Sequence, residues 1–156
     1  MLAALGEVSI RHGFLDLILR RTIKTLANVT VVEVDKALAR SGASEMRGMI
    51  ERLAKRRLGK GHSAVLRLKA ILFDCERASS KRNQFTHEPW AKFLDGDAVL
   101  YHHTGETLPM PTAAELRQLA NEILRVATAL NEARLQGFLM EALTEVENRS
   151  PLMLTS

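Results

Sequence analysis

Apolar residues at helical spacing open the chain. Between residues 3 and 28 they recur at steps of three, four and seven, which at about 100° per residue forms one helix face. That face comprises Leu5, Val8, Leu15, Leu19, Ile23 and Leu26. Ile10, Phe14 and Leu17 lie on roughly the opposite side of the same predicted helix. We therefore expect this helix to be buried on two sides, with the second side against another chain.

Two shorter helices are expected next. Residues 33–40 continue in a helical pattern, although the β-branched run 30–34 by itself would favour a strand. Ser44 is typical of an N-cap, here for a helix that ends near Arg57. The apolar face of that helix comprises Met46, Met49, Ile50 and Leu53.

A helix over residues 63–86 has the clearest apolar stripe. The stripe comprises Val65, Leu68, Ile71, Leu72, Cys75 and Ala78. One turn further it reaches Arg82, where a charge must be paired, drawn into a cleft or presented at an interface. A polar line beside the stripe comprises Glu76, Ser80, Asn83 and His87. Pro89 disfavours helical geometry at the residue before it, so the helix is expected to end near His87.

The segment after this helix predicts a β-hairpin. Residues 90–94 and 98–103 have the pattern of two short strands, with a turn at Asp95-Gly96. Two strands are marginally stable by themselves, so the hairpin is expected to lean on the helices.

The start of the last long helix is marked by Thr112 and Glu115, which have the spacing of a capping box. Its apolar face comprises Leu116, Leu119, Ile123, Val126 and Leu130. Near Gly137 the apolar set moves to a different side, formed by Leu135, Leu139, Leu143 and Val146. The helix therefore either breaks at Gly137 or continues past the body to pack on something else.

Together these elements predict an all-α fold, an antiparallel helical bundle with a small β-hairpin insertion before the last long helix. The length of 156 residues fits one domain, which we place at residues 1–147, with a flexible tail over 148–156. No stretch approaches the roughly 18 apolar residues that a membrane span needs, and the first residues lack the pattern of an export signal. A cytoplasmic protein without membrane contact is expected.

The cysteine and histidine content argues against a metal or cofactor site. Cys75 is the single cysteine, which excludes an internal disulfide and a multi-cysteine zinc site, and its place on the apolar stripe predicts a buried thiol. His102 and His103 would point to opposite faces of a strand. His12 lies on an apolar helix face, where a hydrogen-bonded core histidine is the common outcome. No metal and no cofactor is expected.

The charge of the chain is divided between its halves. The net charge is +4, but residues 1–82 carry 17 basic and 8 acidic side chains, whereas residues 83–156 carry 5 and 10. Such a division fits either a surface for a polyanion or two halves that neutralise each other. The basic side chains expected to contact RNA are Lys55, Arg56, Arg57, Lys60 and Lys81. Cations at a helix C-terminus are also favoured by the helix dipole alone.

A short motif, Arg82-Asn83-Gln84-Phe85-Thr86-His87, lies at the end of the predicted helix over residues 63–86. It resembles the Arg-x4-His motif of HEPN domains, in which a polar residue, often asparagine, follows the arginine. Trp90 and the capped helix after it resemble a group of HEPN-like bacterial proteins with an Arg-Asn-x-x-x-His-x-x-Trp signature. The resemblance covers roughly residues 5 to 132.

The resemblance implies an HEPN-like helical bundle, commonly a homodimer, whose active members are metal-independent endoribonucleases. It places Arg82 and His87 at the family's catalytic positions and Asn83 at its supporting polar position. It further implies a toxin-like ribonuclease that leaves 2′,3′-cyclic phosphate ends, with RNA as substrate and a protein antitoxin as partner.

The chemistry of these side chains is compatible with that activity. Metal-free RNA cleavage needs a base for the 2′-hydroxyl, a proton donor for the leaving oxygen and a cation at the phosphate. Imidazole can act as acid or base near neutral pH, and guanidinium can hold phosphate in a bidentate grip. Arg82 and His87 are five residues apart, about 140° around a helix, so one chain aims them apart unless the helix end bends or two chains pair.

Two other interpretations stay open. Arg82, Asn83 and His87 could form a hydrogen-bonded network that locks the helix end, with Trp90 as a core aromatic. Alternatively the chain is a catalytically silent HEPN-like homodimeric module that binds RNA, a nucleotide or a protein.

Overall fold

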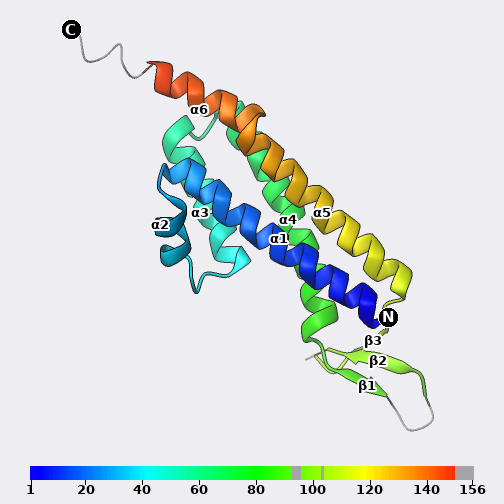
Figure 1. The fold of residues 1–156 in the computed structure, drawn as a ribbon. Coiled ribbons are helices and arrows are strands. Elements are labelled where there is room, and N and C mark those ends of the chain that lie inside the picture. Colours follow the sequence, from blue (N-terminus) through cyan, green and yellow to red (C-terminus); the bar gives the residue numbers. More distant parts are fainter. Residues whose placement is uncertain (93–95, 103, 150–156) are drawn as a thin grey trace.

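The described part of the chain, residues 1–92, 96–102 and 104–149 of a computed structural model, folds into helices and one small sheet (Figure 1). The helices are α1 (Leu2–Ala27), α2 (Val31–Ala37), α3 (Ala43–Leu58), α4 (Ser63–His87), α5 (Ala113–Leu135) and α6 (Phe138–Arg149). The strands are β1 (Trp90–Lys92), β2 (Ala98–Tyr101) and β3 (Thr107–Pro109). The predicted mostly helical class is confirmed.

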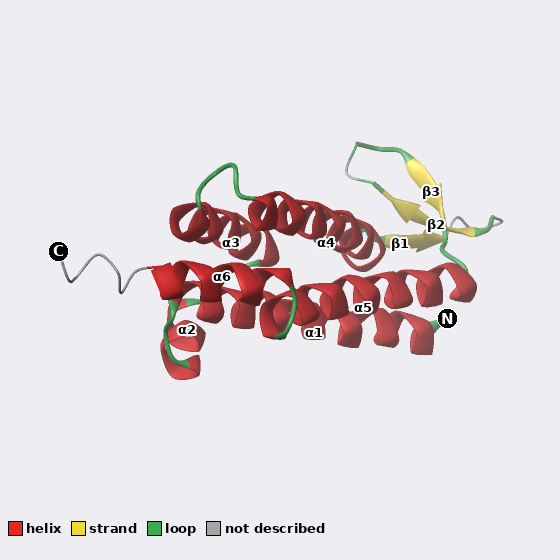
Figure 2. Cartoon of the chain, turned by 90° about the horizontal axis from the view of Figure 1, so that it is seen from above, coloured by secondary structure: helices red, strands yellow, loops and turns green. Residues whose placement is uncertain are grey.

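The long helices pack in two layers. In Figure 2, α3 and α4 form one layer, and α1 and α5 form the other. α1 packs along α5 and α3, while α4 packs on α5 and α3. Figure 1 shows α4 running in the opposite direction to α1 and α5.

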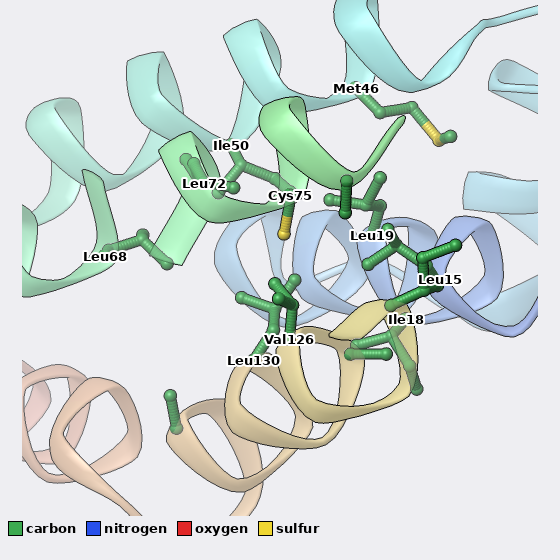
Figure 3. Close-up of a cluster of buried hydrophobic side chains, with 14 of the residues drawn as sticks. Leu15, Ile18, Leu19, Met46, Ile50, Leu68, Leu72, Cys75, Val126 and Leu130 are labelled. Atoms are coloured by element: carbon green, nitrogen blue, oxygen red, sulfur yellow. The ribbon is translucent and has the colours of Figure 1, made fainter. Parts of the chain in front are cut away.

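The core lies between these layers and uses the apolar faces predicted from the sequence (Figure 3). On α4 the predicted stripe is buried except for Ile71, which is half-buried. All the predicted face residues of α5 are buried. Core side chains that Figure 3 labels are Leu15, Ile18, Leu19, Met46, Ile50, Leu68, Leu72, Cys75, Val126 and Leu130. Apolar burial of this extent is the main source of stability of such a bundle.

The two sides of α1 have different surroundings. The predicted core side is buried, and His12 within it lies 3.2 Å from Ser79 Oγ through its Nε2, which confirms a hydrogen-bonded core histidine. The opposite side is exposed in this chain, with Ile10 73% and Leu17 41% exposed. The sequence predicts burial of α1 on two sides, but within this chain only one side is buried.

Of two local expectations near α2 and α3, one is confirmed and one is wrong. The expected short helix forms as α2, because Thr30 and Glu33 make a capping box at its start: Thr30 Oγ1 accepts from Glu33 N–H at 3.2 Å, and the Glu33 carboxylate accepts from Thr30 N–H at 2.8 Å. Ser44 is not the N-cap of α3. The helix begins at Ala43, with extended Gly42 as its N-cap.

The last long helix breaks at Gly137, which is one of the two alternatives that the sequence predicts. The N–H of Gly137 donates to Glu132 O at 2.9 Å, and a Cβ on this residue would lie 3.1 Å from that same oxygen. After the break α6 packs on α3 and α4, so Leu139 and Leu143 are buried within the chain. α6 runs to Arg149, and residues 150–156 of the expected tail lie outside the described residues.

The small sheet stands at one end of the bundle, between α4 and α5 in the chain (Figure 1). β1 and β2 pair antiparallel, with Trp90 opposite Leu100, as the predicted hairpin requires. β3 is an additional strand that the sequence pattern did not indicate. The Trp90 indole N–H donates to Phe85 O at 3.1 Å and thus ties the sheet to α4. Asp95, in the predicted turn, and His103 lie outside the described residues.

None of the helices in the described ranges is long and apolar enough to cross a membrane.

The position of Cys75 allows a direct test of the core. Its side chain is fully buried, and burial raises the pKa of the thiol to about 12. Because the thiolate is the reactive form, native protein at pH 8 should react with a thiol reagent far more slowly than denatured protein. Ellman's reagent in buffer and in denaturant measures the two rates. Equal rates would mean that the stripe containing Cys75 does not face the core.

Candidate functional site

The end of α4 fixes the position of His87. Glu88 leaves the helix with φ −71° and ψ 132°, the extended geometry that a following proline favours. His87 is therefore the last helical residue, as predicted. At the other end, His62 caps α4 by accepting from Ala64 N–H at 3.1 Å through Nδ1.

Arg82 connects the candidate residues. One of its terminal nitrogens, Nη1, donates to Asn83 Oδ1 at 2.9 Å and lies 3.3 Å from His87 Nε2. The expectation that one chain aims Arg82 and His87 apart is wrong. The helix is regular through His87, and the long arginine side chain spans the angular separation that the backbone imposes.

The contact also constrains the histidine tautomer. A guanidinium has only N–H donors, so it bonds to His87 Nε2 only when that nitrogen carries a lone pair. His87 is then neutral, with its proton on Nδ1. In this state Nε2 can accept a proton from a substrate that displaces the Arg82 contact.

Burial differs among the three residues. Asn83 and His87 are exposed, whereas Arg82 is half-buried at the end of the apolar stripe. Arg82 Nε is buried and has no hydrogen-bond partner within the described ranges. The predicted stripe therefore carries its charged residue to the edge of the core, where Asn83 and His87 pair with the guanidinium.

An open concavity of about 890 Å³ lies beside this cluster. The polar line predicted from helical spacing faces it as a whole, because Glu76, Ser80, Asn83 and His87 all belong to its lining. The other lining residues are Phe73, Arg77, Lys81, Gln84, Glu88, His102 and Glu122. Arg82 does not belong to the lining but contacts Asn83 and His87, which do.

Charges of both signs line the concavity. Arg77 and Lys81 contribute cations, and Glu76, Glu88 and Glu122 contribute carboxylates. The carboxylate of Glu88 lies 3.5 Å from His102 Nε2. His102 Nδ1 accepts from Thr104 N–H at 3.3 Å, which leaves the proton of a neutral ring on Nε2, toward Glu88.

The predicted basic residues are not brought together. Lys81 lines the concavity, but Lys55, Arg56, Arg57 and Lys60 lie near the start of α4. α4 has 25 residues and is thus about 37 Å long, so the cluster lies at the other end of the bundle. Arg57 donates to the carbonyls of Thr25 and Leu26 and to Glu147, and Lys55 pairs with Glu51. Both have partners within the fold.

Four residues of the concavity escaped sequence reasoning: Phe73, Arg77, His102 and Glu122. Phe73 and Arg77 lie one turn apart on the helical line that continues to Gln84, so their positions could have been inferred from spacing. His102 and Glu122 come from the sheet and from α5, and no spacing rule relates them to α4.

Within the described ranges, no group of three or more histidine, cysteine, aspartate or glutamate side chains is arranged to hold a metal ion. A comparison with protein-family models, curated proteins and solved structures found no match for this chain.

Because Asn83 and His87 are exposed, stability measurements can distinguish a functional cluster from a hydrogen-bonded network that stabilises the helix end. His87→Ala and Asn83→Ala should each change the free energy of unfolding by less than about 0.5 kcal/mol, as surface substitutions do. His12→Ala is the matched control, because its buried partner Ser79 loses a hydrogen bond, with an expected cost of about 1–3 kcal/mol. Urea titration measures all three. A loss at His87 as large as that at His12 would favour the network.

Proposed function

We propose that this protein is a metal-independent endoribonuclease of the HEPN type, which cleaves RNA to 2′,3′-cyclic phosphate ends. The contact between the Arg82 guanidinium and His87 Nε2, at 3.3 Å, carries the proposal. It brings a cation for phosphate and a neutral imidazole to one point at the edge of an open concavity.

Each step of this cleavage has a candidate group. His87 Nε2 accepts the proton of the 2′-hydroxyl as the 2′ oxygen attacks phosphorus. Arg82 transfers its N–H donors to the phosphate oxygens and stabilises their charge in the transition state. The bond from phosphorus to the 5′ oxygen breaks, and that oxygen takes a proton. His102, in the same concavity, is the candidate donor within the chain in its imidazolium form, which becomes neutral imidazole when it gives up the proton.

Exposure favours this function over a structural lock. A hydrogen-bonded network stabilises a helix end most when it is shielded from water. The net contribution of one intramolecular hydrogen bond is only about 0.5–1.5 kcal/mol, because it replaces hydrogen bonds to water in the unfolded chain. Asn83 and His87 are instead open to solvent at the wall of the concavity. Asn83 holds the Arg82 guanidinium in place at 2.9 Å, which is a positioning role.

The carboxylates of the concavity support a second candidate. Glu76, Glu88 and Glu122 disfavour a polyanion, and they suit a catalytically silent HEPN-like module that binds a nucleotide, RNA or a protein such as an antitoxin. Wild-type protein that binds RNA or a protein partner without cleaving varied RNAs would favour this candidate.

The cleavage proposal is tested with purified protein and total RNA. Wild-type protein should cleave in the presence of EDTA and leave 2′,3′-cyclic phosphate ends, whereas His87→Ala and Arg82→Ala should abolish cleavage. His62→Ala, at the other end of α4, and Arg117→Ala, on exposed α5 surface, are controls that should retain it. Gel analysis and end-group chemistry report both results. Unchanged cleavage by His87→Ala would eliminate His87 as the base.

We also propose that the protein is a homodimer through the exposed side of α1. Ile10, Phe14 and Leu17 are exposed there, and Gly6 and Gly13 beside them have no atom within 4 Å of an added Cβ. Glycine inside a helix costs about 0.5–1 kcal/mol relative to alanine, and packing within the chain gives no reason for it here. Close approach of a second helix would give one.

Light scattering at micromolar concentration tests this interface. The wild-type mass should be twice 17.4 kDa. Ile10→Asp and Leu17→Asp should each reduce it to that of one chain with unchanged helical circular dichroism, because a carboxylate cannot be buried there without a partner. Leu66→Asp, at an exposed leucine of α4, is the control. A wild-type mass near 17.4 kDa would contradict the dimer.

A further inference from the structure

Phe73 is an aromatic side chain exposed in the same concavity as His87. It is 60% exposed on α4, and it lines the concavity together with Asn83 and His87. Most of the apolar surface of this ring therefore stays in contact with water, which is unfavourable. Every nucleic-acid base has a flat face that can cover such a ring.

Two cations that line the concavity lie between Phe73 and His87. Arg77 is one helical turn after Phe73, and Lys81 is one turn further, and both line the concavity. Arg77 Nη1 is 3.9 Å from Asp74, a distance at which an exposed pair contributes little. Both cations can therefore contact phosphates of a strand laid along α4.

The spacing along α4 sets the length of strand that reaches Phe73. Phe73 and His87 are fourteen residues apart in sequence, which is about 21 Å along a helix axis. A stacked single strand rises about 3.4 Å per nucleotide, so about six nucleotides span this distance.

The carboxylate of Glu76 indicates which bases suit the Phe73 end. Glu76 lies three residues after Phe73 and lines the same wall. A carboxylate repels phosphate but accepts a hydrogen bond from the exocyclic amino group of cytosine, adenine or guanine. Uracil offers a carbonyl there instead.

We propose that Phe73 and Glu76 form a distal subsite for a base of single-stranded RNA that carries an exocyclic amino group (cytosine, adenine or guanine), about six nucleotides from the scissile phosphate, with Arg77 and Lys81 on the intervening phosphates. The subsite rests on the proposed ribonuclease function. It makes an unpaired segment of RNA the substrate, since a base within a duplex has no free face for Phe73.

The test uses DNA oligonucleotides that contain one ribonucleotide, because only this position has the 2′-hydroxyl that cleavage needs. A four-nucleotide substrate is compared with substrates extended by eight deoxycytidines on the 5′ or the 3′ side. Wild-type protein should gain kcat/KM from one extension, through a lower KM. Phe73→Ala should remove about 5- to 150-fold of this gain, leave kcat unchanged and cleave the short substrate as wild type does.

Three variants make the result specific. Phe73→Trp should retain the gain, and Leu66→Ala, which removes an exposed apolar side chain of α4 outside the concavity, should match wild type. A thymidine extension should gain less than a deoxycytidine one, and Glu76→Ala should remove that difference. An equal gain in Phe73→Ala and wild type, with cleavage intact, would overturn the subsite while the ribonuclease function stands.

Absence of cleavage by wild-type protein would instead overturn the ribonuclease. In that case the subsite is tested by the binding of a fluorescent twelve-nucleotide RNA, measured by anisotropy. Weaker binding by Phe73→Ala than by wild type and Leu66→Ala would support it. Equal binding by all three proteins, or no binding by wild type, would overturn it.

Discussion

The guanidinium of Arg82 is the group on which the arrangement of the site depends. Its backbone belongs to the buried stripe of α4, but its charge cannot remain in the core without a partner. The side chain therefore extends to the surface, where its Nη1 lies 2.9 Å from Asn83 Oδ1 and 3.3 Å from His87 Nε2. A single contact thus links the apolar core to an exposed imidazole and selects the tautomer of that imidazole.

The end of α4 also determines the exposure of His87. Pro89 forces Glu88 out of the helix, so His87 is the last helical residue and has no following turn to cover it. Trp90 then bonds to Phe85 O and holds the sheet against the end of α4. This anchor brings His102 and Glu88 into the concavity, although they come from outside the helices.

Helical periodicity predicted most of the fold because the core is built from regular faces. The stripe of α4, the capping box at Thr112 and the polar line ending at His87 each depend on residues within a few turns. Features that depend on long-range packing escaped prediction. Spacing could not show that Arg82 reaches His87, because that contact depends on side-chain length. Nor could it place β3, or bring Glu122 beside α4.

The distribution of charge determines what the concavity can bind. The basic cluster near residue 57 belongs to the other end of the bundle, and Arg57 there holds the last carbonyls of α1. The concavity itself has two cations against three carboxylates, so general attraction to a polyanion cannot provide its affinity. In the proposed ribonuclease, recognition would therefore come from short-range contacts, which are the Arg82 guanidinium at one phosphate and stacking of a base on Phe73. Stacking on Phe73 requires an unpaired base, so such an enzyme would act on a loop or single strand of RNA rather than on a duplex.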